Sequence, residues 1–464
     1  MSNEVSMEKI VSLCKKRGFV FPGSSIYGGL ANSWDFGPLG TELKNNIRDW
    51  WWHRFVHSRS DMVGLDAAIM MNPKVWEASG HVENFNDAMV DCKACKQRFR
   101  ADHLIEDNVK GVFADGMALD AMTKLIKEKN IVCPTCGQHD FTEARTFNLL
   151  FQTSIGKTQG NKESIYLRGE IAQAMFVNFK NVLDSSRKRL PFGIASVGKA
   201  FRNEITPGNF IFRTLEFDLM EFEYFIREQD WETQFEYWLG EQQNWLKEMG
   251  FADENLRTRE QGPEERAHYS KRTVDIEYNS PFGWKELFGN AYRTDHDLKN
   301  HTKHSKEDLK YTDPESGEKF IPHVIEPTFG LSRLTLMTML EAYTEEPVPS
   351  AKGEMETRVV MKFHPRIAPY KIAILPLSKK PELSQVAKEL QLQLTKKWYT
   401  DYDETQSIGK RYRRQDEIGT PYCVTIDFDS LEDKKATVRD RDTMGQDRVE
   451  LSELENYFKE RFDF

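Results

Sequence analysis

The sequence contains no long hydrophobic run. It has no uninterrupted apolar stretch of about 18 residues, the length that a membrane-spanning helix requires. Residues 1–10 hold neither an apolar core nor the other marks of a secretory signal. We therefore expect a cytoplasmic protein with no membrane segment.

The sequence also has no excess of positive charge. Its 64 Lys and Arg are outnumbered by 73 Asp and Glu, which gives a net charge of −9. This balance argues against a protein that coats nucleic acid with bulk positive charge, although a local basic patch can still bind phosphates. Residues 410–414, Lys-Arg-Tyr-Arg-Arg, are one such patch, and an ordinary solvated face is the alternative.

Common nucleotide-binding motifs are absent. Gly156-Lys157-Thr158 resembles the end of a P-loop, but position 151 is Phe where that motif requires Gly. No G-x-G-x-x-G follows a predicted strand, so the usual dinucleotide-binding fold is not supported. No set of Ser, His and Asp stands out by its spacing as an acyl-transfer site.

Cysteine is scarce, but four of the six cysteines form two Cys-x-x-Cys pairs. Without a secretory signal, metal binding is favoured over disulfides. Two such pairs suit a tetrahedral site of four thiolates, although the gap at residues 96–132 exceeds the usual ~15–20 residues and implies a small inserted element. Redox-active or unliganded cysteines are the alternative. The predicted zinc ligands are Cys92, Cys95, Cys133 and Cys136.

Periodic patterns predict helices and strands in the first three quarters of the chain. Apolar side chains recur at helical spacing over residues 6–17 and 42–56, and strand-like alternation follows at 62–71. Residues 213–225 alternate apolar and acidic side chains, which predicts an antiparallel strand with one buried face. Further predictions are a helix over 231–249, polar and irregular chain over 252–320, and a helix over 334–343.

The pattern changes after a Pro-containing linker at residues 363–369. Strands then alternate with helices, which predicts a separate α/β domain of about 95 residues. We expect strands at 371–377, 422–428 and 436–439, and a helix over 381–398.

One predicted hairpin carries informative polar residues. Phe201-Arg202-Asn203-Glu204 precedes a turn at 206–209, and residues 210–217 form the returning strand. The planar fork of Arg202 suits a phosphate group, and Glu204 can accept hydrogen bonds from an amino group. On spacing alone, a surface hairpin with a salt bridge is the simpler interpretation.

This hairpin resembles motif 2 of the class II aminoacyl-tRNA synthetases, which is Phe-Arg-x-Glu, a loop and a second strand. Gly330-Leu331-Ser332-Arg333 and the helix after it resemble motif 3, and residues 37–73 resemble motif 1, a long helix and a strand ending in Pro. The three motifs occur in the family's order. The chain lacks the His-Ile-Gly-His and Lys-Met-Ser-Lys-Ser sequences of class I synthetases.

The resemblance narrows to glycyl-tRNA synthetases of the homodimeric type, because similar segments run nearly from end to end. These segments are residues 37–40, 99–103, 166–170, 293–295, 324–327, 407–412 and 437–442.

The resemblance implies an α+β fold. A class II catalytic domain with an antiparallel sheet and helices would occupy residues 1–365, with a zinc-bearing insertion at about 85–145 and a second insertion at about 230–320. Residues 366–464 would form an α/β anticodon-binding domain, in which residues 410–414 would meet RNA phosphates and stack a base on a tyrosine. A homodimer is implied by the same resemblance.

The implied reaction has two steps. Glycine attacks the α-phosphate of ATP to give glycyl-adenylate, and the glycyl group then passes to the 3′ end of tRNA(Gly). No protein nucleophile is needed, so the site has to align the reactants and stabilise phosphate charge. The expected partners are ATP, glycine and tRNA(Gly), with Mg²⁺ on the phosphates and a structural Zn²⁺ in the insertion.

The family pattern assigns roles at the ATP end of the site. Arg202 would hold the α-phosphate and Arg333 the γ-phosphate, and these two are the expected catalytic residues. The expected ATP-binding residues are Arg202, Asn203, Glu204, Phe212, Arg213, Thr214, Leu215, Glu216, Phe217, Glu286, Leu287, Gly330, Leu331, Ser332 and Arg333.

At the glycine end, the resemblance points to an acidic set for the ammonium group, Glu170, Glu216 and Glu326. Arg100 and Arg293 would lie near the carboxylate or the adenylate. The expected substrate-binding residues are Arg100, Glu170, Phe217, Asp218, Leu219, Met220, Glu221, Arg293, Glu326, Pro327, Thr328, Phe329 and Gly330.

Some positions depart from the family pattern. Residues 168–171 are Arg-Gly-Glu-Ile where Arg-Pro-Glu-Thr is usual, and Leu215 and Leu219 replace polar residues. Thr328 stands where Ser is usual, which adds a methyl group to a pocket that has to be tight. The alternatives are a class II synthetase for alanine, serine or threonine, and a synthetase-like paralogue that binds RNA without charging it.

Overall fold

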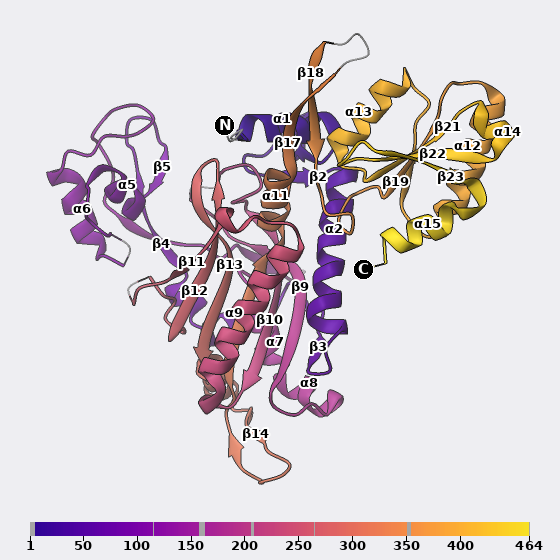
Figure 1. Ribbon diagram of the computed structural model, residues 1–464. Coiled ribbons are helices and arrows are strands. Elements are labelled where there is room, and N and C mark those ends of the chain that lie inside the picture. The colour runs from indigo at the N-terminus through magenta and orange to yellow at the C-terminus, as the bar shows by residue number, and fades with distance from the viewer. Residues whose placement is uncertain are drawn as a thin grey trace.

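The computed structural model describes residues 5–114, 116–156, 163–205, 208–263, 265–349 and 354–463. Lys157 and Thr158, of the rejected P-loop resemblance, and Thr206 and Pro207, of the predicted turn, lie outside them. Figure 1 shows a central domain with a purple insertion on one side and a yellow C-terminal domain on the other. No helix in these ranges is long and apolar enough to cross a membrane.

A seven-stranded sheet in the order β11-β12-β13-β16-β10-β9-β3 forms the centre of the molecule. Its neighbouring strands are antiparallel, as expected, except that β3 runs parallel to β9. The strands are β3 (Met62–Gly64), β9 (Phe192–Phe201), β10 (Glu216–Ile226), β11 (Leu256–Glu260), β12 (Arg272–Ser280), β13 (Gly283–Thr294) and β16 (His323–Gly330).

Helices cover both faces of this sheet. The larger core joins one face to α2, α9 and α11, and a second core joins the other face to α7. Figure 1 shows α9 crossing in front of the strands. The helices are α1 (Met7–Arg17), α2 (Pro38–Trp52) with a π-helical turn at His53–His57, α7 (Ala172–Val177), α8 (Phe179–Ser186), α9 (Trp231–Glu248), α10 (His296–Ser305) and α11 (Leu331–Ala342).

Aromatic side chains make up much of the larger core. Phe222 of β10 lies with its ring centroid 4.6 Å from that of Trp238 on α9, and Phe329 of β16 lies 5.1 Å from Phe55. Trp51 of α2 packs edge-on against Phe329 at 5.5 Å. Because such rings bury large apolar areas, they hold α2 and α9 tightly on the sheet.

The helix predictions near the N-terminus are confirmed, with shifted ends. Ser6 caps α1, its hydroxyl accepting the Lys9 N–H, and Gly18 ends it with φ of +78°. Helix α2 begins at Pro38, earlier than predicted, and Gly40 packs against Phe19. A Cβ at position 40 would lie 1.9 Å from the Phe19 carbonyl oxygen, so this contact requires glycine.

Three expectations about residues of the central sheet are wrong. The strand predicted over residues 62–71 is only Met62–Gly64. Strand β10 is buried on both faces over residues 219–226, because it is an interior strand with helices on either side. Residues 252–320 are not irregular, since they contain β11, β12, β13 and α10. Ion pairs across strands, such as Arg257 with Glu277, explain their polar composition.

The cysteine-bearing insertion has a sheet and a core of its own. Its strands are β4 (Asn86–Asp91), β5 (Arg98–Arg100) and β6 (Arg145–Asn148), in the order β5-β4-β6, and its helices are α5 (Ala101–Asn108) and α6 (Leu119–Glu128). Leu104 and Ile105 of α5 are buried together with Met122 and Ile126 of α6. The two helices fill the long gap between the cysteine pairs.

Smaller elements flank the central sheet. They are β1 (Val20–Pro22), β2 (Trp34–Phe36), α3 (Pro73–Ala78), α4 (His81–Asn84), β7 (Gln152–Ile155), β8 (Glu163–Tyr166), β14 (Tyr311–Thr312) and β15 (Lys319–Phe320).

The C-terminal part alternates strands and helices as predicted. Its sheet has the order β20-β19-β21-β22-β23. The strands are β19 (Ile372–Pro376), β20 (Thr400–Tyr402), β21 (Tyr422–Ile426), β22 (Lys435–Asp440) and β23 (Gln446–Glu450), and the helices are α12 (Pro381–Leu394), α13 (Ile408–Ile418), α14 (Asp429–Asp433) and α15 (Leu454–Arg461).

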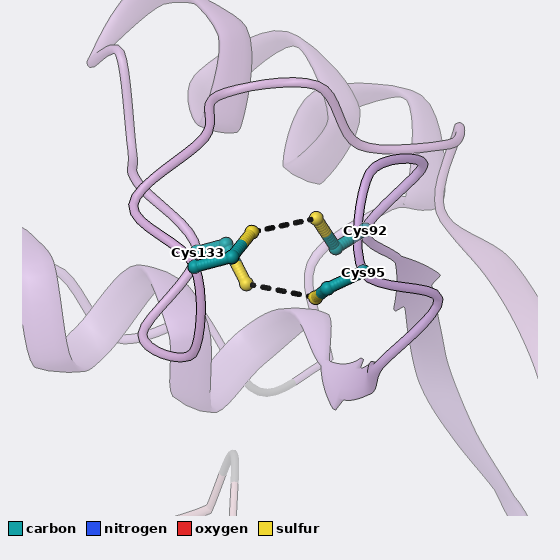
Figure 2. A group of neighbouring side chains, drawn as sticks. Cys92, Cys95 and Cys133 are labelled. Atoms are coloured by element: carbon teal, nitrogen blue, oxygen red, sulfur yellow. Dashed lines mark hydrogen bonds between the residues drawn. The ribbon is translucent and has the colours of Figure 1, made fainter.

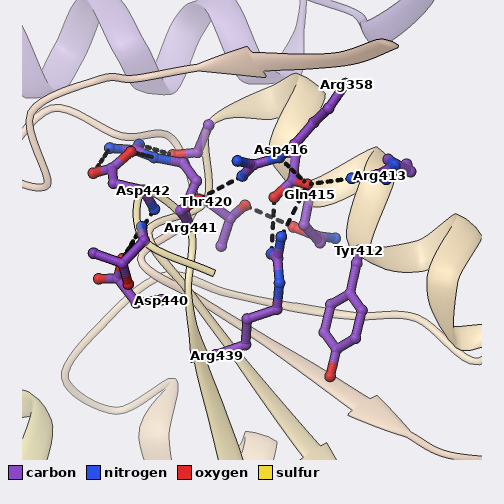
Figure 3. A network of polar contacts seen from close by, with 12 residues as sticks. Arg358, Tyr412, Arg413, Gln415, Asp416, Thr420, Arg439, Asp440, Arg441 and Asp442 are labelled. Carbon is purple, nitrogen blue, oxygen red and sulfur yellow. Dashed lines mark hydrogen bonds and ion pairs between the residues drawn. The ribbon is translucent and has the colours of Figure 1, made fainter. Parts of the chain in front are cut away.

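A buried charge network joins the C-terminal part to the rest of the chain. Strands β17 (Tyr343–Pro349) and β18 (Met355–Met361) form a hairpin beside α13. Arg358 of β18 is fully buried and donates from Nε to Asp416 on α13 at 2.8 Å. Arg439 of β22 donates to both oxygens of Asp416 (Figure 3). Arg441 donates to the Phe363 carbonyl.

Part of the basic run at residues 410–414 contributes to packing within the domain. Arg411 is buried and donates to the carbonyls of Pro376 and Leu377. The Tyr412 hydroxyl lies 2.5 Å from the hydroxyl of Thr425, and its partly buried ring packs against the sheet. Lys410 is exposed and Arg413 is partly exposed, so contact of this run with RNA stays a prediction.

We expect Asp416→Ala to lower the free energy of unfolding by about 3–5 kcal/mol, because it leaves two buried guanidinium groups without their carboxylate. Urea unfolding of the full chain measures this loss. Glu432→Ala, at an exposed position on α14, is the matched control and should change stability little. Equal behaviour of the two variants would contradict a structural role for this network.

Candidate active site

A cavity opens on one face of the central sheet, at the β9–β10 hairpin, the end of β16 and the start of α11. The fold brings many of the predicted site residues together there. Those that line the cavity are Glu170, Arg202, Glu204, Phe212, Arg213, Thr214, Phe217, Asp218, Leu219, Glu221, Glu286, Leu287, Glu326, Thr328, Gly330, Ser332 and Arg333.

Two arginines from distant parts of the chain lie in this cavity. Arg202 donates from Nε to the Gly169 carbonyl at 3.0 Å and lies over the ring of Phe217 at 5.3 Å. Arg333 lies over the ring of Phe212 at 4.6 Å. Contact with an aromatic face fixes a guanidinium while its N–H edge stays available to an anion.

Three buried carboxyl groups line the other end of the cavity. Glu221 of β10 pairs across the sheet with Thr328 of β16, whose hydroxyl donates to Glu221 Oε1 at 3.1 Å. Glu326 lies two residues before Thr328 and therefore on the same face. Glu170, just before α7, completes the group, and all three carboxylates are buried. Closely spaced carboxyls at one end of a cavity favour a cationic ligand.

One fully buried guanidinium neutralises part of this acidic group. Arg293 of β13 donates from Nε and Nη2 to Asp297 at 2.8 Å, and from Nη1 to Glu326 at 2.5 Å. Its Nη2 lies 3.8 Å from Glu170. The planar fork of arginine suits several carboxylates at once, which the single point charge of lysine does not.

The carboxyls have divergent proton affinities. Burial alone would raise the pKa of Glu170, but His81 and Arg293 hold it well below its usual range. Asp297 behaves in the same way beside Arg293. In contrast, burial and the nearby Glu326 raise the pKa of Glu221 well above its ordinary value. The surroundings therefore favour the ionised form of Glu170 and Asp297 and the protonated form of Glu221.

Sequence reasoning missed the groups that orient Glu170. The His81 Nε2 atom lies 3.2 Å from Glu170 Oε2, and Gln173 donates to both Glu170 and Asp297 at 2.9 and 2.8 Å. Tyr269 lies with its ring 3.8 Å from the Arg293 guanidinium. His81 and Tyr269 are far from Glu170 in the sequence, so no spacing links them to it, whereas Gln173 follows Glu170 by only three residues.

Several predicted site residues lie elsewhere. Side chains of a strand alternate between faces, so Met220 and Phe329 join the apolar core behind the sheet. Leu331, the first residue of α11, lies in the same core. Glu216 is half exposed and pairs with Lys199 at 2.5 Å, so the structure does not place it with Glu170 and Glu326, whereas Glu221 lies beside them.

The remaining predicted residues also fall outside this cavity. Arg100 pairs with Asp87 at 3.2 Å and lines a neighbouring hollow beside the insertion. Leu215 lines a second hollow next to β2. Arg293 lies behind the cavity wall, and Asn203 and Pro327 do not line the cavity.

The four cysteines of the insertion converge. The Sγ atoms of Cys92 and Cys136 lie 3.6 Å apart, as do those of Cys95 and Cys133. Figure 2 shows Cys133 facing Cys92 and Cys95. Four thiolates around one Zn²⁺ at ~2.3 Å would place sulfurs about 3.8 Å apart, so the arrangement fits the ion.

Each Cys-x-x-Cys pair lies in a backbone turn of the same kind. The Lys96 N–H donates to the Cys92 carbonyl, and the Gly137 N–H donates to the Cys133 carbonyl. Residues 96 and 137 both have positive φ, of 62° and 72°. This repeated geometry aims each pair of sulfurs at a common centre.

The C-terminal part matches a known family. Residues 371–461 match the model of the anticodon binding domain. An α+β chain with an antiparallel central sheet and such a domain fits a class II aminoacyl-tRNA synthetase.

Similar curated proteins define the family more narrowly. A glycine–tRNA ligase of Caldanaerobacter subterraneus is 54% identical over 468 residues, with both chains fully covered. One from Bacillus cereus is 55% identical, covering 99% of this chain and 100% of the relative, and one from Acetivibrio thermocellus is 55% identical with full coverage of both. The chain belongs to the glycine–tRNA ligase family.

We expect Arg293→Lys to lower the free energy of unfolding by about 2 kcal/mol, because lysine cannot serve Asp297 and Glu326 together and leaves a buried carboxylate without a donor. Denaturant unfolding measures the change. Arg227→Lys, which alters an exposed pair with Glu318, should cost less than about 1 kcal/mol. If Arg293→Lys were as stable as the native protein, the single point charge of lysine would be sufficient at this position.

Proposed function

We propose that the cavity activates glycine with ATP and that the chain transfers the glycyl group to tRNA(Gly). The full-length similarity to glycine–tRNA ligases carries this proposal. The cavity supports it, because cationic side chains lie at one end and buried carboxyls at the other. Such a site can hold a nucleotide phosphate and an ammonium group at the same time.

At the cationic end, Arg202 would bind the α-phosphate and Arg333 the γ-phosphate of ATP. The charge that develops on the α-phosphate during attack by the glycine carboxylate would meet a guanidinium that is already fixed by Gly169 and Phe217. Preorganised donors of this kind stabilise a transition state without rearranging. Phe212 and Phe217 would give adenine and ribose apolar contacts.

Mg²⁺ would bind between the ATP phosphates and carboxylates of the cavity wall. Asp275 and Glu286 line the cavity, and Glu286 Oε2 lies 3.1 Å from Arg333 Nη1. Burial and Glu286 raise the pKa of Asp275 to about 6, although Arg259 lies 3.2 Å away. When bound, the ion would neutralise phosphate charge, with phosphate and carboxylate oxygens as its ligands.

At the acidic end, Glu170, Glu221 and Glu326 would receive the ammonium of glycine. Because glycine offers no side chain, its selection requires that the space beside its Cα be filled. Thr328 occupies the cavity wall next to Glu221, where its methyl group would narrow this space. We propose that this end of the cavity excludes larger amino acids.

The remaining assignments follow from the same proposal. The anticodon-binding match supports contact with tRNA through residues 371–461, in which Lys410 and Arg413 are at least partly exposed. Charging tRNA is a step of protein biosynthesis, so we infer a cytoplasmic site of action. We also propose a homodimer, in line with the resemblance to homodimeric synthetases.

Glycine-dependent exchange of pyrophosphate into ATP tests the first step. We expect exchange with glycine and far less with alanine or serine. Arg202→Ala should slow it by about 100–1000-fold, because the α-phosphate loses a fixed donor. Arg189→Ala, on the surface near Glu315, is the control and should leave exchange unchanged. Preference for alanine or serine would indicate a different synthetase, and no exchange with any amino acid would indicate a non-charging paralogue.

We propose that Cys92, Cys95, Cys133 and Cys136 bind one structural Zn²⁺. Their sulfur atoms all lie within 4.8 Å of one another, as four ligands of one tetrahedral ion would. Elemental analysis should find about one zinc per chain. Cys133→Ser should release it, whereas Cys423→Ala, at a buried cysteine of β21, should retain it. A folded, fully active protein without metal would refute the zinc proposal.

A further inference from the structure

Glu223 is a buried carboxyl group that the proposed reaction does not use. It lies on β10, its side chain is fully buried, and it does not line the cavity. Neither of its carboxyl oxygens has a hydrogen-bond partner among the described residues. An ionised carboxylate in such a place would cost a large desolvation free energy, so the group calls for an explanation.

The strand register brings Glu223 next to the ammonium-binding group. The pairs Glu221 with Thr328 and Tyr224 with Ile325 set the register of β10 against β16, and this register puts Glu223 opposite Glu326. Two ionised carboxylates directly opposite each other on neighbouring strands repel. Oxygens of Glu221, Glu223 and Glu326 all lie within 4.8 Å of one another.

The charges around Glu223 do not balance if every group is ionised. Glu326 on β16, Glu221 on β10 and Asp297 on α10 would then face it with negative charge, and Arg293 on β13 is the cation among the groups that act on it. Helix α7, which packs on the same face of β10, holds no titratable side chain. A proton in this cluster relieves the repulsion.

We propose that Glu223 is a positioning residue for glycine binding: it stays a neutral carboxyl behind the cavity and holds Glu221 and Glu326 in place for the ammonium. It does not touch glycine itself. Its proton allows three carboxyls to lie together, so that the two that line the cavity keep one orientation. This inference rests on the proposed glycine activation.

The proton affinity of the group agrees with this role. Burial, and then the charge of Glu326, raise the pKa of Glu223 well above its ordinary value. In the unfolded chain the same group titrates near 4.3. A pKa that is higher in the folded state means that stability is full below the unfolded pKa and falls as the pH rises toward the folded pKa.

Glu223→Gln tests the charge state without any need for activity. Glutamine resembles a protonated glutamate but never ionises, so the variant avoids the loss of stability at higher pH. We expect its melting temperature to match the native value at pH 5 and to exceed it by roughly 3 °C at pH 8. Glu232→Gln, on the exposed part of α9, makes the same change of charge and should show no such divergence.

Glycine-dependent pyrophosphate exchange tests the positioning role. Glu223→Gln should keep kcat and the KM for glycine within about threefold of native, because the amide has the shape and the neutrality of a protonated carboxyl. Glu223→Leu stays neutral but puts an apolar group beside Glu221 and Glu326, so its KM for glycine should rise about tenfold while kcat and the KM for ATP change little. A rise in the KM for glycine alone distinguishes a positioning role from a general loss of structure, which would also change kcat and the KM for ATP.

Two results would overturn the proposal. A Glu223→Gln variant that is less stable than native at pH 8 would mean that an ionised carboxylate is required. A native KM for glycine in Glu223→Leu would mean that Glu223 positions nothing. If the native chain shows no glycine-dependent exchange, the proposed function fails, whereas the melting curves still decide the charge state of Glu223.

Discussion

The buried guanidinium of Arg293 is the interaction on which the site depends. Glu170, Glu326 and Asp297 come from three different elements, and each would repel the others in a dry interior. Arg293 holds them together because its fork donates in several directions at once. Without this cation, the acidic end of the cavity could not exist in the middle of a sheet covered by helices.

This constraint also explains why β10 is unusual. An interior strand normally carries apolar residues on both faces, yet β10 places Glu221 and Glu223 on one of them. The opposite face, with Phe222 and Tyr224, packs on α9 and supplies the apolar burial that stabilises the strand. One face of β10 therefore packs in the apolar core, and the other face carries the carboxyl groups of the site.

Sequence alone predicted the elements well and the orientation of their side chains less well. The motif hairpin, the helix after Arg333 and the C-terminal α/β pattern were visible because apolar periodicity reports which residues form helices and strands. Glu216 and Glu221 could not be told apart, since both are acidic residues of one strand, and only strand register decides which one faces the cavity. The strands over 252–320 were missed because cross-strand ion pairs make buried sheet look like solvated chain.

The link between Arg358 and Asp416 bears on how this architecture can be recombined. The residues that match the anticodon-binding domain do not include every partner of its buried charges. One of the cations that pair with Asp416 is Arg358, which belongs to the β17–β18 hairpin. Residues 371–461 transplanted onto another catalytic domain would bring the acceptor without one of its donors. A transplanted segment therefore has to include the β17–β18 hairpin, and it is longer than the segment that matches the domain family.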